Sequence, residues 1–151
     1  MRDNLPAIQM FLFVTFLIAA SVFDLNWRII PDFLCSLIFL TGLLTFTPVK
    51  LFGILLALPL LAAALIKEGG MGGGDIKLTA AGGFVLGLPI GCVELIIGLS
   101  SVIMWYLARK GIGKRKQIPI QATEIQTLPL APFLSSGFIA AIIINIGGSL
   151  I

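Results

Sequence analysis

The sequence contains no histidine. This absence excludes Ser-His-Asp and Cys-His catalysis, histidine metal sites and haem ligation by histidine. Cysteine is almost as scarce, since the only two, Cys35 and Cys92, lie far apart in apolar segments and form no C-x-x-C pair. A zinc ribbon and a dithiol redox motif are therefore excluded as well. We expect neither a metal ion nor a cofactor.

Charged residues are also rare: they make up 11% of the 151 residues, whereas 58% are hydrophobic. The mean hydropathy is +1.11. A soluble domain of this size needs far more charge to cover its surface. The composition therefore predicts an all-α, polytopic membrane protein with one domain, residues 1–151. The net charge of +3 is expected to set membrane orientation and not to bind nucleic acid.

The apolar runs predict a bundle of about six transmembrane helices, each needing about 20 residues to cross a bilayer. The first three runs are Leu5 to Phe23, Phe33 to about Thr47, and Leu51 to Ile66. Residues 78–107 form either one over-long helix or two helices that turn at Gly87 to Gly91. Proline flanked by glycines favours the turn, so a short fourth span begins near Asp75 and a fifth follows. The sixth span is Leu128 to Ile151.

The basic residues are distributed unevenly between the two sides of this arrangement. Eight of the ten fall in the loops at 24–32, 67–77 and 108–127, and two fall on the other side. Basic loops remain in the cytosol, so these three loops are predicted to be cytosolic. The chain is then a multi-pass protein of the cytoplasmic membrane with both termini outside.

Three of the seven acids, Asp24, Asp32 and Asp75, lie at span ends on this same predicted face. Two carboxylates brought together at a membrane boundary can share a proton and activate water without a metal ion or histidine. Alternatively, the three acids mark helix ends independently. Glu94 is a further intramembrane acid, and we expect it to reach water near the outer boundary.

Glycines crowd the segment before Asp75, which reads GGMGGGD from Gly69. Glycine permits a positive φ and a close approach of another chain, and an acid that must meet an extended peptide needs such a backbone. Gly82 and Gly83 are expected to let the fourth span pack closely on a neighbouring helix.

Three motifs in order resemble those of the type IV prepilin peptidases, which are G-x-G-D intramembrane aspartyl proteases. The segment GGGDIKL, 72–78, is similar to their second aspartate motif. The segment DLNWRIIPD, 24–32, is similar to the first, and LPLAPFL, 128–134, is similar to the proline-rich entry into the last helix. The resemblance extends from the first span to the sixth.

The resemblance implies catalytic roles for Asp24 and Asp75, with Gly72, Gly74 and Lys77 shaping the substrate site. Asp32 matches a position that holds Asp or Asn in the family, which implies a structural role. Lys77 either interacts with the carboxylate pair or extends to the lipid headgroups. The implied partners are the lipid bilayer and a prepilin or pseudopilin-like substrate, cut on the cytosolic side after a short basic leader and before an apolar helix.

The chain departs from the long form of the family, which has a cytosolic segment with two C-x-x-C pairs linked to N-methylation. Only nine residues join the first two predicted spans, so a peptidase without methyltransferase activity is expected. The rival hypothesis is a small proton-coupled transporter or a non-enzymatic membrane subunit. A peptidase should hold its aspartates at one cytosolic boundary, whereas a carrier should hold acids near mid-membrane.

Overall fold

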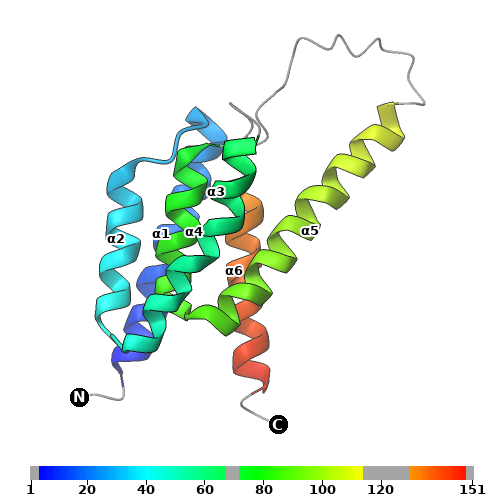
Figure 1. Ribbon diagram of the computed structural model, residues 1–151. Helices are drawn as coiled ribbons and strands as arrows, with labels where there is room; N and C mark the ends of the chain where they lie inside the picture. Colours follow the sequence, from blue (N-terminus) through cyan, green and yellow to red (C-terminus); the bar gives the residue numbers. More distant parts are fainter. Residues whose placement is uncertain (1–3, 67–71, 114–129, 149–151) are drawn as a thin grey trace.

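A computed structural model describes residues 4–66, 72–113 and 130–148 of the chain. These residues form six α-helices and one 3-10 helix, and no strand occurs among them. In chain order the elements are α1 (Leu5–Trp27), α2 (Asp32–Leu43), η1 (Pro48–Leu56), α3 (Ala57–Ile66), α4 (Gly73–Leu86), α5 (Leu88–Gly113) and α6 (Ala131–Gly148). Because η1 continues directly into α3, the described residues form six helical rods, as the sequence predicted (Figure 1).

Three of these rods are long and apolar enough to cross a membrane, namely Leu5–Trp27, Pro48–Ile66 and Leu88–Trp105. The helices α2 and α6 are apolar but shorter. With 12 and 14 residues, α2 and α4 extend only about 18–21 Å at 1.5 Å per residue. The six-helix membrane bundle predicted from the sequence is therefore correct, but its helices differ widely in length.

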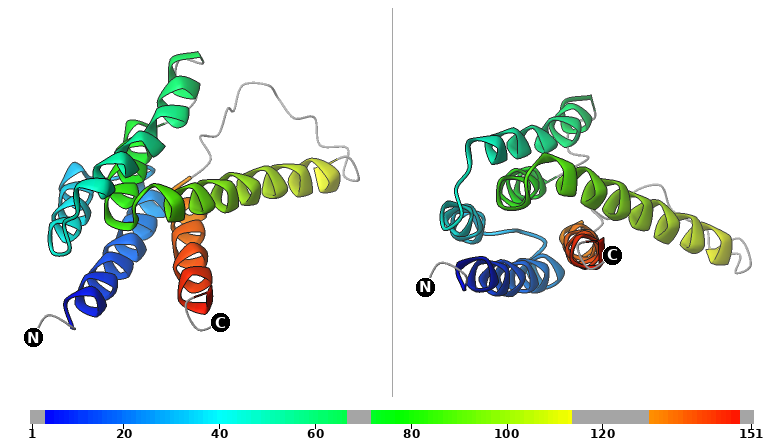
Figure 2. Two further views of the ribbon diagram at one scale, coloured as in Figure 1. Left: turned by 60° about the horizontal axis from the view of Figure 1, so that its bottom comes forward. Right: turned by 90° about the horizontal axis from the view of Figure 1, so that it is seen from below.

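The helix α4 occupies the middle of the bundle. It packs against α2 on one side, η1 and α3 on another, and α5 and α6 beyond (Figure 2). Two of its glycines explain this central place, because a side chain at Gly82 would overlap the ring of Phe138 and one at Gly83 would overlap the backbone of Gly53. The close packing expected of Gly82 and Gly83 is confirmed.

The ambiguous stretch 78–107 is divided into two helices. The break is Gly87, whose φ of +83° favours glycine. The expected turn at residues 87–91 is thus confirmed in place but is shorter than expected: α5 already begins at Leu88, and Pro89 lies in its first turn, where proline is tolerated. From this break α5 packs across α6, and its far end diverges from the rest of the bundle (Figures 1 and 2).

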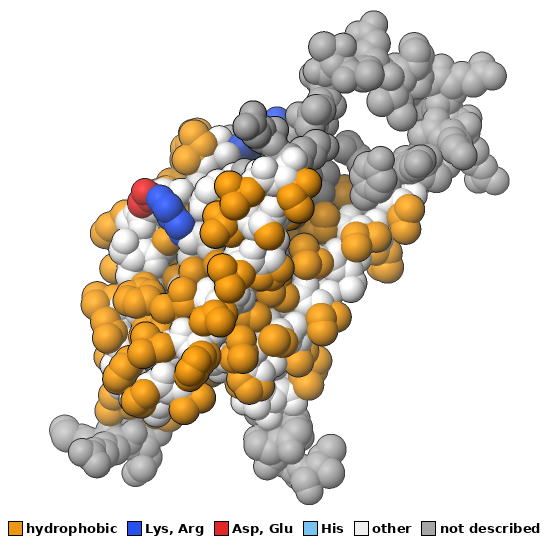
Figure 3. All heavy atoms as spheres, viewed as in Figure 1, with side chains coloured by type: hydrophobic (Ala, Val, Ile, Leu, Met, Phe, Trp, Pro, Cys, Tyr) orange, Lys and Arg blue, Asp and Glu red, His pale blue; other side chains and the backbone are white. Residues whose placement is uncertain are grey.

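The outer surface of the bundle is hydrophobic. Phe11, Leu65 and Met104, from three different helices, are each 73% or more exposed, and apolar side chains cover most of the face seen in Figure 3. Large continuous apolar surfaces of this kind are covered by a partner or a membrane. The chain is therefore a membrane protein.

Candidate active site

Asp24 lies on the buried stripe of α1. The buried residues of this helix are spaced three or four apart, so they share one helix face: Gln9, Phe13, Leu17, Ala20 and Asp24. The helix runs four residues past the predicted end at Phe23, which places Asp24 in its last turn. Asp24 is only 6% exposed because it continues a stripe that is otherwise the core of the bundle.

The carboxylate of Asp24 meets the beginning of α6. The backbone N–H of Ala131 donates a hydrogen bond of 3.0 Å to its Oδ2. Ala131 is the first residue of α6, so the N–H has no partner within the helix and the positive end of the helix dipole faces the carboxylate. One turn further into the bundle, the Ser21 hydroxyl donates a hydrogen bond of 2.8 Å to the Ser135 hydroxyl and ties the same two helices. These contacts hold Asp24 in position.

Asp75 lies in the first turn of α4 and is 7% exposed. Its backbone N–H donates to the carbonyl of Gly72, which closes this first turn. The side chain faces inwards, because the buried face of α4 continues at Leu78, Thr79 and Gly82. Within the described part of the chain, its Oδ1 is buried and has no hydrogen-bond partner.

The two aspartates face one space. A cavity of about 300 Å³ is lined by both of them, by the loop after α1 and by the start of α4. Asp24 lies in the last turn of α1, and Asp75 lies in the first turn of α4. Both are therefore at the same end of the bundle, opposite the start of α1 and the end of α6 (Figure 1). Among the described residues, no group of three His, Cys, Asp or Glu side chains is arranged to hold a metal ion.

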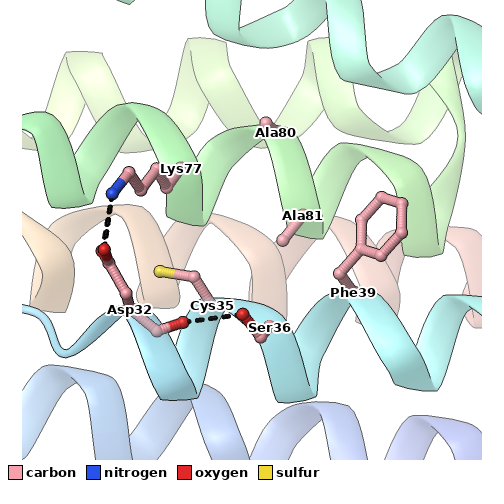
Figure 4. Close-up of a pocket in the computed structure, with 7 residues that line it drawn as sticks. All are labelled: Asp32, Cys35, Ser36, Phe39, Lys77, Ala80 and Ala81. Atoms are coloured by element: carbon pink, nitrogen blue, oxygen red, sulfur yellow. Dashed lines mark hydrogen bonds and ion pairs between the residues drawn. The ribbon is translucent and has the colours of Figure 1, made fainter.

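Asp32 and Lys77 form an ion pair at the edge of this cavity. The Nζ of Lys77 lies 2.7 and 2.8 Å from the two carboxylate oxygens of Asp32 (Figure 4). Lys77 was expected either to interact with the carboxylate pair or to reach the lipid headgroups. It instead pairs with Asp32. The bond ties the start of α2 to the first turns of α4, two residues beyond Asp75.

Close packing, and not an unusual backbone angle, explains the glycine directly before Asp75, Gly74. Gly72 has a φ of −72°, and Gly87 is the only glycine with positive φ among the described residues. The positive φ expected before Asp75 is thus wrong for Gly72, Gly73 and Gly74, while Gly69 and Gly70 lie outside the described residues. A Cβ on Gly74 would lie 2.9 Å from the Cβ of Ile30, whereas one on Gly73 would meet nothing within 4 Å.

Glu94 does not reach water, contrary to expectation. It is fully buried in α5, and neither carboxyl oxygen has a hydrogen-bond partner among the described residues. The physical reason is the close α5–α6 contact, where a side chain on Gly137 would press on the Glu94 carbonyl. An acidic side chain near the start of a helix is therefore shielded from water when a neighbouring helix packs over it.

Two contacts of the site were missed by sequence reasoning. The Ala131 N–H is a backbone group without a side-chain signature, although Pro132 beside it is typical of a helix start. Ile30, 7% exposed, appears in the sequence as an ordinary loop residue. A hydrophobic residue inside a polar loop was the available signal.

Known proteins are similar to this chain over most of its length. The sequence model of the type IV leader peptidase family matches residues 11–146. The prepilin leader peptidase/N-methyltransferase of Bacillus subtilis (strain 168) is 33% identical over an alignment of 137 residues, which covers 85% of this chain and 52% of the relative. The chain thus spans about half the length of that relative. No solved structure matches significantly. Both aspartate motifs and the start of the last helix lie inside the matched residues, and the chain belongs to the type IV leader peptidase family.

Proposed function

We propose that the chain is a membrane-embedded aspartyl endopeptidase that removes the short leader from type IV prepilin or pseudopilin-like precursors. One observation carries this proposal: Asp24 and Asp75, from separate motifs of the sequence, are both buried and line one cavity at one end of the bundle. Two carboxylates in such a site can activate water for attack on a peptide bond.

The contacts of the two aspartates differ, and we base the proposed roles on this difference. The Ala131 N–H and the α6 dipole stabilise negative charge on Asp24. Asp24 is therefore the general base that takes a proton from water. Asp75 carries the proton of the pair and donates it to the scissile carbonyl oxygen, since no other group occupies its Oδ1 among the described residues. The two groups titrate as a coupled pair.

The first turn of α4 is placed to hold the substrate backbone. Gly72, Gly73 and Gly74 line the cavity, and the first N–H groups of a helix have no acceptor within it. We assign the amides of Gly72 and Gly74 to an extended substrate segment at the carboxylates. Side chains at Gly72 or Gly74 would intrude, since a Cβ on Gly72 would lie 3.3 Å from the Asp75 Oδ2.

In the cell, the carboxylate end of the bundle faces the cytosol, and both termini lie on the other side of the cytoplasmic membrane. The uneven distribution of basic residues supports this orientation. The name of the Bacillus relative includes N-methyltransferase activity. We propose the peptidase activity alone for this chain, because its two cysteines lie on separate helices, α2 and α5, and form no C-x-x-C pair.

One observation supports the carrier hypothesis: Glu94 is a buried acid inside the bundle. It remains the weaker hypothesis, since Asp24 and Asp75 lie together at one end of the bundle and the family match favours a peptidase.

The decisive experiment is cleavage of a type IV prepilin co-reconstituted with the protein in liposomes. The wild type should shorten the precursor, whereas Asp24→Asn and Asp75→Asn should each abolish cleavage and still insert into the membrane. Full cleavage by either single variant contradicts the carboxylate pair.

The assignment of roles has its own measurement. In infrared spectra, the carboxylic-acid band of the pair should persist in Asp24→Asn and disappear in Asp75→Asn. The reverse pattern would show that the proton resides on Asp24.

A further inference from the structure

A second cavity lies beside the aspartates, between α2 and α4. It has a volume of about 400 Å³, and Figure 4 shows it extending from the Asp32–Lys77 ion pair past Ala80 and Ala81 to Phe39. We name it the α2–α4 groove. Asp32 and Lys77 also line the aspartate cavity, so the groove and the candidate active site are continuous.

Small side chains make the groove, and an aromatic ring ends it. Ser36 on α2 and Ala80 and Ala81 on α4 leave the space between the helices unfilled. Phe39 closes the far end and is stacked on Phe84, with ring centroids 4.4 Å apart. The stacking holds Phe39 as a fixed wall, so the groove is a preformed feature of the bundle.

The lining determines what can bind. Beyond the ion pair the walls are apolar, and the Ser36 hydroxyl donates to the carbonyl of Asp32. A peptide in such surroundings must satisfy its own backbone groups, so it must be helical and apolar. At the ion pair the groove meets the glycine-rich first turn of α4. The backbone N–H groups of this turn can donate hydrogen bonds to an extended peptide backbone.

The ion pair at this boundary is easily opened. Its side chains are 56% and 72% exposed, and exposed ion pairs contribute only about 0–1 kcal/mol. A substrate can therefore cross from the groove to the aspartates.

On these grounds we propose that the α2–α4 groove docks the apolar helical segment that follows the scissile bond, while the bond itself lies between Asp24 and Asp75. The proposal rests on the peptidase function above. A smaller cavity of about 200 Å³ between α5 and α6 is a poorer candidate, because it has no lining residue in common with the aspartate cavity.

The first test fills the groove. Ala80→Phe places a ring in the space, and Ala62→Phe on the exposed face of α3 is the matched control. In the liposome assay Ala80→Phe should raise KM about tenfold, since excluding part of an apolar group from its pocket has effects of this size. Its kcat should be preserved, and Ala62→Phe should resemble the wild type. An unchanged KM, or a loss confined to kcat, overturns the docking role.

The second test identifies the occupant. A photo-cross-linker on Ala80→Cys, in a Cys35→Ser, Cys92→Ser, Asp75→Asn protein, should attach to substrate residues after the scissile bond. The same probe on Ala62→Cys should not. Cross-links from position 80 to lipid alone, or to a second copy of the chain, would contradict the proposal. Absence of cleavage by the wild type would instead refute the peptidase function itself, so the two failures are distinguishable.

Discussion

Replacing Gly74 by alanine should reduce catalysis while leaving the bundle intact, whereas the same change at Gly73 should have little effect. The two glycines are neighbours in the first turn of α4 and differ in their surroundings. A Cβ on Gly74 would lie 2.9 Å from the Cβ of Ile30, and one on Gly73 would find open space.

The size of the effect follows from this distance. Carbon atoms in contact normally lie about 3.5–4.0 Å apart, so Gly74→Ala requires a displacement of roughly 0.6–1.1 Å. Ile30 is 7% exposed and packs in the buried core of the bundle, so we expect the start of α4 to move. Asp75 follows Gly74 directly and moves with it. Misplacement of a reacting group by about 1 Å can cost on the order of 100-fold in rate.

Stability provides an internal control, because glycine-to-alanine changes generally favour a helix by up to about 1 kcal/mol. Neither variant should therefore insert or fold poorly. In the liposome assay we expect Gly74→Ala to be slower in kcat by about 10- to 100-fold, and Gly73→Ala to remain within about twofold of the wild type.

Two results would refute the reasoning. Equal losses in both variants would show that the segment acts only as a flexible linker. Unchanged cleavage by Gly74→Ala would show that the contact with Ile30 does not position Asp75.

Three further predictions concern other parts of the molecule. Asp32→Asn should retain most cleavage activity, because an amide oxygen still accepts a hydrogen bond from Lys77; loss comparable to that of Asp75→Asn would give Asp32 a catalytic role. Gly82→Leu should lower the yield of folded protein in detergent, because its side chain would overlap the buried ring of Phe138 and overpacking costs about 1–3 kcal/mol. The control is Gly98→Ala, whose Cβ would lie 3.4 Å from the nearest Leu134 atom. Equal yields of the two variants would contradict the packing argument. A cysteine at position 114, in a Cys92→Ser protein, should resist an impermeant thiol reagent added outside intact cells; ready labelling would reverse the proposed orientation.

The sequence by itself determined the class of the protein and the order of its helices. Low charge and long apolar runs leave a helical membrane bundle as the available fold, and Pro89 between glycines located the break before α5. It also determined that Asp24 and Asp75 are the residues to examine, because three family motifs occur in order along the chain. These features depend on local composition and spacing, which a single chain displays directly.

Only the tertiary structure decided which groups meet. The Ala131 N–H reaches Asp24 from α6, Lys77 pairs with Asp32, and Ile30 lies against Gly74. Each of these contacts joins segments far apart in the sequence. Glu94 illustrates the same limit, since its position near the start of α5 suggested hydration but the packing of α6 buries it. Burial and contact depend on how helices pack against one another, and the spacing of residues within one helix does not contain that information.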